Sequence, residues 1–258
     1  MKVTICELND ERKAFAEDWE SLTEYLDREP SDLLLLPEMP FCEWWADTPE
    51  FNSEKQLSAV EIHAEYIKNF ETLHAKNILY SRPVAKNGRF HNVAFIWNAV
   101  RGEVPVHTKQ YFPQEPYFYE ETWFDADDTG FKVLEVEGLR IGVLLCTEMW
   151  FTQHARKYGE LGADLLLCPR ATGISSVDQW IRCGQTLAVI SGAFCLSSNR
   201  TGTAGNGFRW GGNGWIAQPA DGKLLGVTSA RQKFLTIDID ISLAQNAKKE
   251  YPLYVNTR

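Results

Sequence analysis

The sequence predicts an α/β fold in a single domain, built as a layered sandwich of sheets and helices. Short apolar runs typical of buried strands alternate with helical patterns at both ends of the chain, whereas residues 78–145 resemble strand and loop almost throughout. The 258 residues are enough to bury one large core, and no repeat, low-complexity segment or Ser/Gly-rich linker divides them. We therefore expect one domain over residues 1–258.

Strands are expected where short, mostly apolar runs stand between turn-forming residues. They cover 3–6, 33–36, 78–85, 93–97, 104–108, 131–136, 139–145, 165–168, 193–197, 214–218 and 234–239. The longest helix is expected over 54–76, because Ser53 and Gln56 form a capping-box pattern ahead of apolar residues at helical spacing. Those apolar residues are Leu57, Val60, Ala64, Ile67 and Phe70. Shorter helices are expected near 11–27, 152–161 and 176–190.

Composition and charge exclude several classes of partner. With 26 basic and 35 acidic residues the net charge is -9, and no basic cluster offsets it, so nucleic acid is not an expected partner. The amino terminus does not have the pattern of a signal peptide, and no apolar stretch approaches the roughly 20 residues of a membrane span. We expect no membrane association and a cytoplasmic location. The six cysteines form no C-x-x-C pair and are expected to be free thiols.

The Gly-rich segment GTAGNGFRWGGNGW is a candidate phosphate loop by composition. It lacks the G-K-[ST] ending of a P-loop, and no expected helix follows to supply an anion-binding amino terminus. A tight turn between strands accounts for it better than nucleotide binding.

Three polar residues follow apolar runs at the ends of expected strands: Glu38, Lys109 and Cys146. Each also has a simpler interpretation, as a loop carboxylate or ion-pair partner, a solvated lysine and a core cysteine. A Cys-His hydrolase is a further alternative, but no histidine is aimed at the strand that ends at Cys146, and no metal-ligand spacing is present. Taken together, a carboxylate can accept the thiol proton, and an ammonium can hold the oxyanion formed when a thiolate adds to a carbonyl.

These motifs resemble the nitrilase (carbon-nitrogen hydrolase) superfamily, nearest to its carbamoylputrescine amidase and aliphatic amidase branches. The segments LLLLPEMPF, HTKQYFP and GVLLCTEMWF look like its glutamate, lysine and cysteine blocks. The resemblance implies a four-layer α-β-β-α sandwich, a homodimer, and neither a cofactor nor a metal. It also implies Cys146 as nucleophile, Glu38 as general base, and Lys109 with the backbone amide of Thr147 as oxyanion donors.

The family also carries a second glutamate after the lysine block. Glu115, Glu120 and Glu121 all stand in that region, and the spacing in the resembling branch selects Glu120. Its implied task is to orient the substrate or the water.

The resemblance implies hydrolysis of a small linear amide or N-carbamoyl compound with release of ammonia. A true nitrile hydrolase and a catalytically idle binding scaffold are the alternatives. For substrate binding, Arg170 is expected either to grip a substrate carboxylate or to pair with Glu148. Trp150 and Tyr117 are candidate aromatic walls of the pocket, and Glu148 is more readily a structural partner for a cation than a catalytic group.

Overall fold

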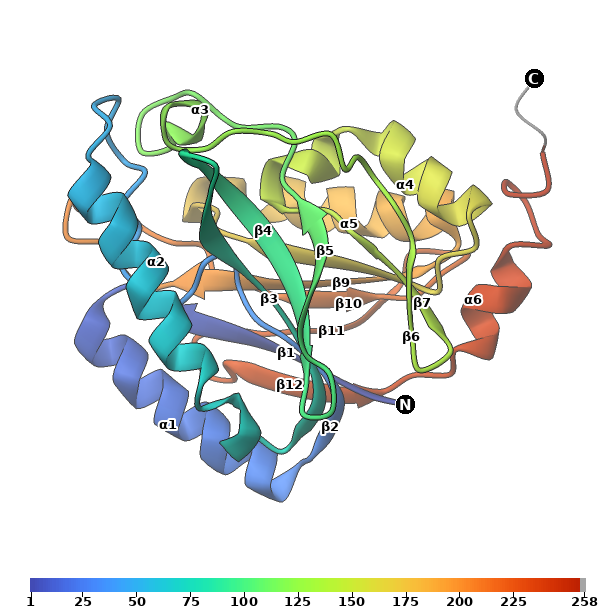
Figure 1. Cartoon of the computed structure of the whole chain (residues 1–258). Coiled ribbons are helices and arrows are strands. Elements are labelled where there is room, and N and C mark those ends of the chain that lie inside the picture. The colour runs from blue at the N-terminus through green and yellow to red at the C-terminus, as the bar shows by residue number, and fades with distance from the viewer. Residues whose placement is uncertain (256–258) are drawn as a thin grey trace.

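Two β-sheets pack face to face in the computed structural model, which describes residues 1–255, and helices cover both outer faces (Figure 1). The first sheet has the order β12-β1-β2-β3-β4-β5 and the second the order β6-β7-β8-β9-β10-β11. The first comprises β1 (Lys2–Asn9), β2 (Ser31–Leu35), β3 (Ala75–Lys86), β4 (Arg89–Asn98), β5 (Gly102–Thr108) and β12 (Phe234–Asp238). The second comprises β6 (Leu134–Val136), β7 (Leu139–Val143), β8 (Leu165–Arg170), β9 (Phe194–Thr201), β10 (Trp215–Ala217) and β11 (Leu224–Val227). The end of β1 also pairs with β9, which joins the two sheets.

The four consecutive leucines of the LLLL run show why continuous apolar runs form these strands. Side chains alternate between the faces of a strand, so Leu33 and Leu35 enter the core between the sheets, while Leu34 and Leu36 pack under the helices. The same alternation sends Leu165 and Leu167 inward and Leu166 outward in β8. Both faces of these strands are therefore buried.

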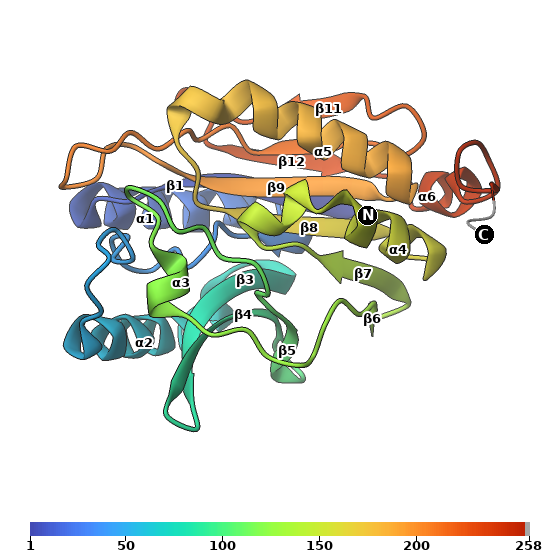
Figure 2. The same cartoon turned by 90° about the horizontal axis from the view of Figure 1, so that it is seen from above.

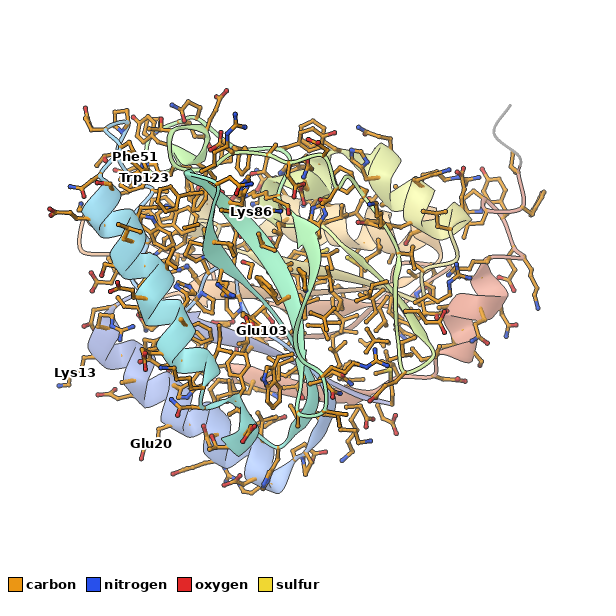
Figure 3. The ribbon with its side chains drawn as sticks, in the orientation of Figure 1. Lys13, Glu20, Phe51, Lys86, Glu103 and Trp123 are labelled. Carbon is orange, nitrogen blue, oxygen red and sulfur yellow. The ribbon has the colours of Figure 1, made fainter. Side chains whose placement is uncertain are left out.

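Helices α1 (Arg12–Arg28) and α2 (Ser53–Ile67) cover the first sheet, and α4 (Thr152–Glu160) and α5 (Val177–Ser191) cover the second. Figure 2 shows α2 and α5 on opposite sides of the paired sheets. Lys13 and Glu20 of α1 are exposed and point away from the sheet (Figure 3). The predicted α-β-β-α sandwich is confirmed.

Every expected strand has a counterpart, but several elements were not expected. They are β11, the short helices α3 (Glu120–Trp123) and α6 (Ser242–Ala247), and the 3₁₀ turns η1 (Phe70–Thr72), η2 (Cys146–Trp150) and η3 (Ile174–Ser176). These segments are short, and β11 is only half-buried and contains a glycine, so their local patterns are weak.

The predicted helix over 54–76 is too long, because α2 ends at Ile67, and the side chains that α2 buries are not the apolar residues from which it was predicted. The chain must leave the helix because Ala75 already pairs with Ser31 of β2. Asn52 caps the helix by accepting the backbone N–H of Lys55, while Gln56 is buried and accepts a 2.6 Å bond from the Trp45 indole. The buried side chains of α2 are Gln56, Ala59 and His63, so Leu57 is left 48% exposed.

The Gly-rich segment connects β9 to β10, as predicted for a turn between strands. Gly212 has φ +55°, and a Cβ there would collide with the Glu7 carboxylate, which accepts a 2.7 Å bond from the Asn213 backbone. None of the helices within residues 1–255 has both the length and the apolar character needed to cross a bilayer.

Candidate active site

The structure brings together the ends of three expected strands from both sheets. Glu38 follows β2, and its backbone N–H donates to the carbonyl of Arg170 at the end of β8. Lys109 follows β5, and its backbone N–H donates to the carbonyl of Asn92. Cys146 lies just beyond β7, and the side chains of Glu38, Lys109 and Cys146 are all buried.

A buried hydrogen-bonded array links one ammonium to two carboxylates. Lys109 Nζ donates to Glu38 Oε1 at 2.7 Å and to Glu120 Oε2 at 2.6 Å. Asn92 Nδ2 also donates to Glu38 Oε1, at 2.8 Å. The other oxygen of the carboxylate, Glu38 Oε2, is buried and has no hydrogen-bond partner among the described residues. This oxygen therefore has free capacity to accept a proton.

Helix α3 positions Glu120 within this array. The helix is only four residues long, so it depends on packing for its place. Trp123 supplies that packing: its ring centroid lies 5.4 Å from that of Phe51, and its indole donates to the Thr48 carbonyl at 2.9 Å (Figure 3).

Cys146 begins η2 with a positive φ of 47°, a conformation that is costly for a residue with a side chain. Its Sγ lies 3.8 Å from the carbonyl oxygen of Ala171. All six cysteines are buried free thiols, as predicted, so burial does not single out Cys146. Its electrostatic interactions with Glu38, Lys109 and Glu120 do.

Electrostatics keep the thiol of Cys146 protonated at rest. Burial raises its pKa well above the ordinary value, and the Glu38 carboxylate raises it further, while Lys109 opposes both. A nucleophilic thiolate therefore requires a base that removes the proton when substrate is bound.

The ammonium of Lys109 remains charged in spite of burial. Burial lowers its pKa, but Glu120 and Glu38 together outweigh that effect and raise the pKa above its usual value. For Glu120, burial dominates: it raises the pKa to about 7, and the charge of Lys109 only partly offsets it.

A small cavity of about 100 Å³ opens onto Cys146. Its walls combine carboxylates, aromatic rings and small hydroxyl side chains, with no arginine, lysine or histidine among the described residues that line it. The lining residues are Pro113, Glu115, Phe118, Glu120, Cys146, Thr147, Ala171, Thr172, Gly173, Ser176 and Trp180. Cys146, Thr147 and Glu120, all predicted site residues, thus share one cavity.

Neither expected alternative for Arg170 is observed among the described residues: Glu148 has other partners, and Arg170 does not line the cavity. Its guanidinium is buried and donates to Ser197, Thr172 and the carbonyl of Asn213 at 2.7 to 2.9 Å. It also lies 4.0 Å from the ring centroid of Trp215. The strand register decides this, because Arg170 at the end of β8 pairs with Asn199 of β9, and its side chain lies among β9 and the Gly-rich loop.

Three other predicted substrate-binding residues also lie outside the cavity wall. Trp150 is 48% exposed and packs its ring on Trp180, which does line the cavity. Tyr117 is 43% exposed, and its ring packs against that of Phe208 at a tilt, with centroids 4.9 Å apart. Glu148 is fully buried and accepts hydrogen bonds from His107 and from two backbone N–H groups.

Sequence reasoning missed Asn92 and Trp180. A polar Asn92 inside the apolar run of β4 was the available signal, because a buried amide requires a partner. Trp180 gives no such signal, since an aromatic residue on an amphipathic helix is ordinarily part of the core.

Comparison with known proteins adds independent information. The profile of the carbon-nitrogen hydrolase family matches residues 2–249. The N-carbamoylputrescine amidase of Solanum tuberosum is 33% identical over 125 residues, which cover 46% of this chain and 41% of that protein. The citrullinase of Francisella tularensis is 28% identical over 189 residues, covering 67% of this chain and 64% of that protein. The matched segment thus spans less than half the length of the plant relative.

Solved structures support the same fold. A carbon-nitrogen hydrolase from Helicobacter pylori G27 superposes with a TM-score of 0.87 at 20% identity, covering 100% of this chain and 95% of that one. An amidase of the nitrilase superfamily from Nesterenkonia AN1 gives 0.74 at 18% identity, covering 95% and 93%. With the family profile spanning nearly the whole sequence, the chain belongs to the carbon-nitrogen hydrolase family.

Proposed function

We propose that this protein hydrolyses the C–N bond of a small linear amide or N-carbamoyl compound through a thioester on Cys146, releasing ammonia. The observation that carries the proposal is the unpaired, buried Glu38 Oε2 beside an ammonium and a thiol that is neutral at rest. Membership of the carbon-nitrogen hydrolase family supports the reaction class.

In the proposed first step, Glu38 accepts the thiol proton of Cys146 as sulfur attacks the substrate carbonyl carbon. The Lys109 ammonium and the backbone N–H of Thr147 stabilise the resulting oxyanion. Glu38 then returns the proton to the nitrogen as the C–N bond breaks, so ammonia leaves and a thioester remains.

In the second step, Glu38 takes a proton from water, and the hydroxide attacks the thioester. Collapse of this intermediate restores the thiol and releases the acid. Glu120 is proposed to orient the substrate or the water from its place in the cavity wall, where it also holds the Lys109 ammonium.

The cavity favours a short substrate with a neutral or cationic tail over one bearing a carboxylate. Its volume of about 100 Å³ is below the range of about 300–1,000 Å³ for drug-sized ligands. Glu115 contributes negative charge, while Phe118 and Trp180 contribute aromatic rings that can contact a cation. The cation expected to hold a substrate carboxylate, Arg170, is committed to other partners. We therefore propose N-carbamoyl amines and short amides as the substrate class.

Ammonia release across a panel of short amides, N-carbamoyl amines, N-carbamoyl amino acids and nitriles tests the function. We expect turnover of the first two classes, and Cys146→Ser should lower kcat by at least about 1,000-fold, because the nucleophile is lost. Cys42→Ser, which alters a buried thiol outside this cavity, is the matched control and should retain activity.

Each contrary result points to a specific alternative. Full turnover by Cys146→Ser would refute the mechanism. Preferential hydrolysis of nitriles would establish the nitrile hydrolase instead. Absence of turnover with every class, by a folded protein, would favour the catalytically idle scaffold.

A further inference from the structure

Glu148 connects, through hydrogen bonds, the two segments that carry the proposed nucleophile and ammonium. Its Oε2 accepts the backbone N–H of Leu145, the residue before Cys146, at 2.7 Å. Its Oε1 accepts the backbone N–H of Gln110, the residue after Lys109, at 2.7 Å. The Glu148 side chain is fully buried.

His107 supplies a third contact to the same carboxylate. Its Nε2 lies 2.7 Å from Glu148 Oε2, and both side chains are buried. Because an ionised carboxylate can only accept hydrogen bonds, this contact requires the proton on Nε2. Three donors therefore bond to the two oxygens of one carboxylate. A glutamine side chain could not accept all three hydrogen bonds, because it has one oxygen and its NH₂ group is itself a donor.

Backbone hydrogen bonds between strands do not connect the segment of Lys109 to that of Cys146, whereas the Glu148 carboxylate does. Lys109 follows β5, which pairs with β4, whereas Cys146 follows β7, which pairs with β6 and β8. Within residues 1–255 no ladder pairs β5 with β7. The separation between ammonium and sulfur is therefore set by contacts across the two sheets, and the Glu148 carboxylate bonds directly to the neighbour of each residue.

We propose that Glu148, held by His107, is a positioning residue that sets the distance between Lys109 and Cys146. Its two oxygens accept hydrogen bonds from His107, Gln110 and Leu145, so it acts through the segments that carry those two groups and not on the substrate. This inference rests on the proposed use of Cys146 and Lys109. A carboxylate that only stabilised the fold would change the melting temperature and leave the folded enzyme's kcat unaltered.

The test compares Glu148→Gln with Glu135→Gln, which makes the same change at an exposed carboxylate of β6. Two rates are measured. The first is kcat for the best amide of the panel, determined together with KM. The second is the rate at which iodoacetamide alkylates Cys146, followed by peptide mass mapping. For Glu148→Gln we expect kcat to fall by on the order of 100-fold, with KM changed less than about 3-fold, because misplacement of catalytic groups by about 1 Å has effects of this size. Alkylation should slow by at least about 10-fold. Glu135→Gln should match the wild type.

Two further variants complete the test. Glu148→Asp keeps the acceptor oxygens and should recover part of the lost kcat, whereas His107→Phe keeps a ring beside Phe131, 4.9 Å away, but removes the hydrogen bond. We expect His107→Phe to lower both rates by about 3- to 10-fold. The effect is smaller than that of Glu148→Gln because the backbone N–H groups of Leu145 and Gln110 still donate to Glu148. If Glu148→Gln fails to fold, His107→Phe decides the question with the same two rates.

A folded Glu148→Gln with wild-type kcat and wild-type alkylation would overturn the inference while leaving the proposed function intact. Conversely, a wild-type protein that hydrolyses no member of the panel would refute the proposed function. The alkylation rates of the wild type and the variants would still decide whether Glu148 positions the thiol.

Discussion

At the scale of single residues, the site concentrates charge where solvent is absent. Lys109, Glu38 and Glu120 are each at most 1% exposed, and an isolated charge at such depth is strongly unfavourable. The array is stable because one ammonium bonds to both carboxylates. The two carboxylates share a single ammonium, however. For Glu120 that ammonium does not fully offset burial, so the pKa of this carboxyl is raised.

The raised pKa of Glu120 predicts a specific pH dependence of stability. Its pKa is about 7 in the folded protein and ordinarily 4.5, so between these values the folded protein holds a proton that the unfolded chain has released. The free energy of unfolding therefore falls as pH rises through this window. Glu120→Gln should remove this dependence and gain on the order of 1–3 kcal/mol relative to wild type between pH 4.5 and 7.

Urea unfolding of both proteins across pH 4.5 to 8 measures the effect. Glu121→Gln is the control, because Glu121 is the exposed neighbour on the same short helix and should follow the wild-type profile. Parallel profiles for the wild type and Glu120→Gln would contradict the burial argument.

At the scale of elements, the ends of strands and helices carry most of the information on function. Apolar runs were sufficient to locate β2, β5 and β7, and the residues after them form the array and the nucleophile turn. Helix α2 behaves differently, because its cap and its buried face depend on partners elsewhere. Asn52 and not Ser53 is the cap, and Gln56 bonds to Trp45 instead of closing a capping box.

The cap of α2 gives a prediction with its own control. Asn52→Ala should lower the free energy of unfolding by about 1 kcal/mol, because the backbone N–H of Lys55 loses its acceptor. Ser53→Ala, at the first helical residue, should change stability by less than about 0.5 kcal/mol. Chemical denaturation of the two variants measures both values. A larger loss of stability for Ser53→Ala than for Asn52→Ala would contradict Asn52 as the cap and support the capping box predicted from the sequence.

At the scale of the whole molecule, the sandwich brings distant segments together at one end of the paired sheets. Lys109 bonds to Glu38, which is 71 positions away in the chain, and to Glu120, which is 11 positions away. The large core between the sheets supports this convergence, because strands buried on both faces leave little freedom for the residues that follow them.

We propose a homodimer, on the basis of the family resemblance. Exposed apolar side chains that suit such an interface occur around α4 and before α5: Trp150, Leu161 and Ile174 are 37% to 48% exposed. Light scattering after size-exclusion chromatography should give twice the mass of one chain, and Ile174→Lys should shift the protein towards the monomer. A wild-type protein that is monomeric at micromolar concentration would refute the proposal.

The sequence by itself determined all strands except β11, the α/β class and three residues that the fold assembles, because apolar runs and the polar residues that end a strand are local features. Only the tertiary structure decided which partners those residues meet. Arg170 bonds to β9 and to two loops, Glu148 joins the neighbours of Cys146 and Lys109, and α2 buries a polar residue. Such choices depend on how two sheets pack across a shared core, where contacts between residues far apart in the chain outweigh local preference.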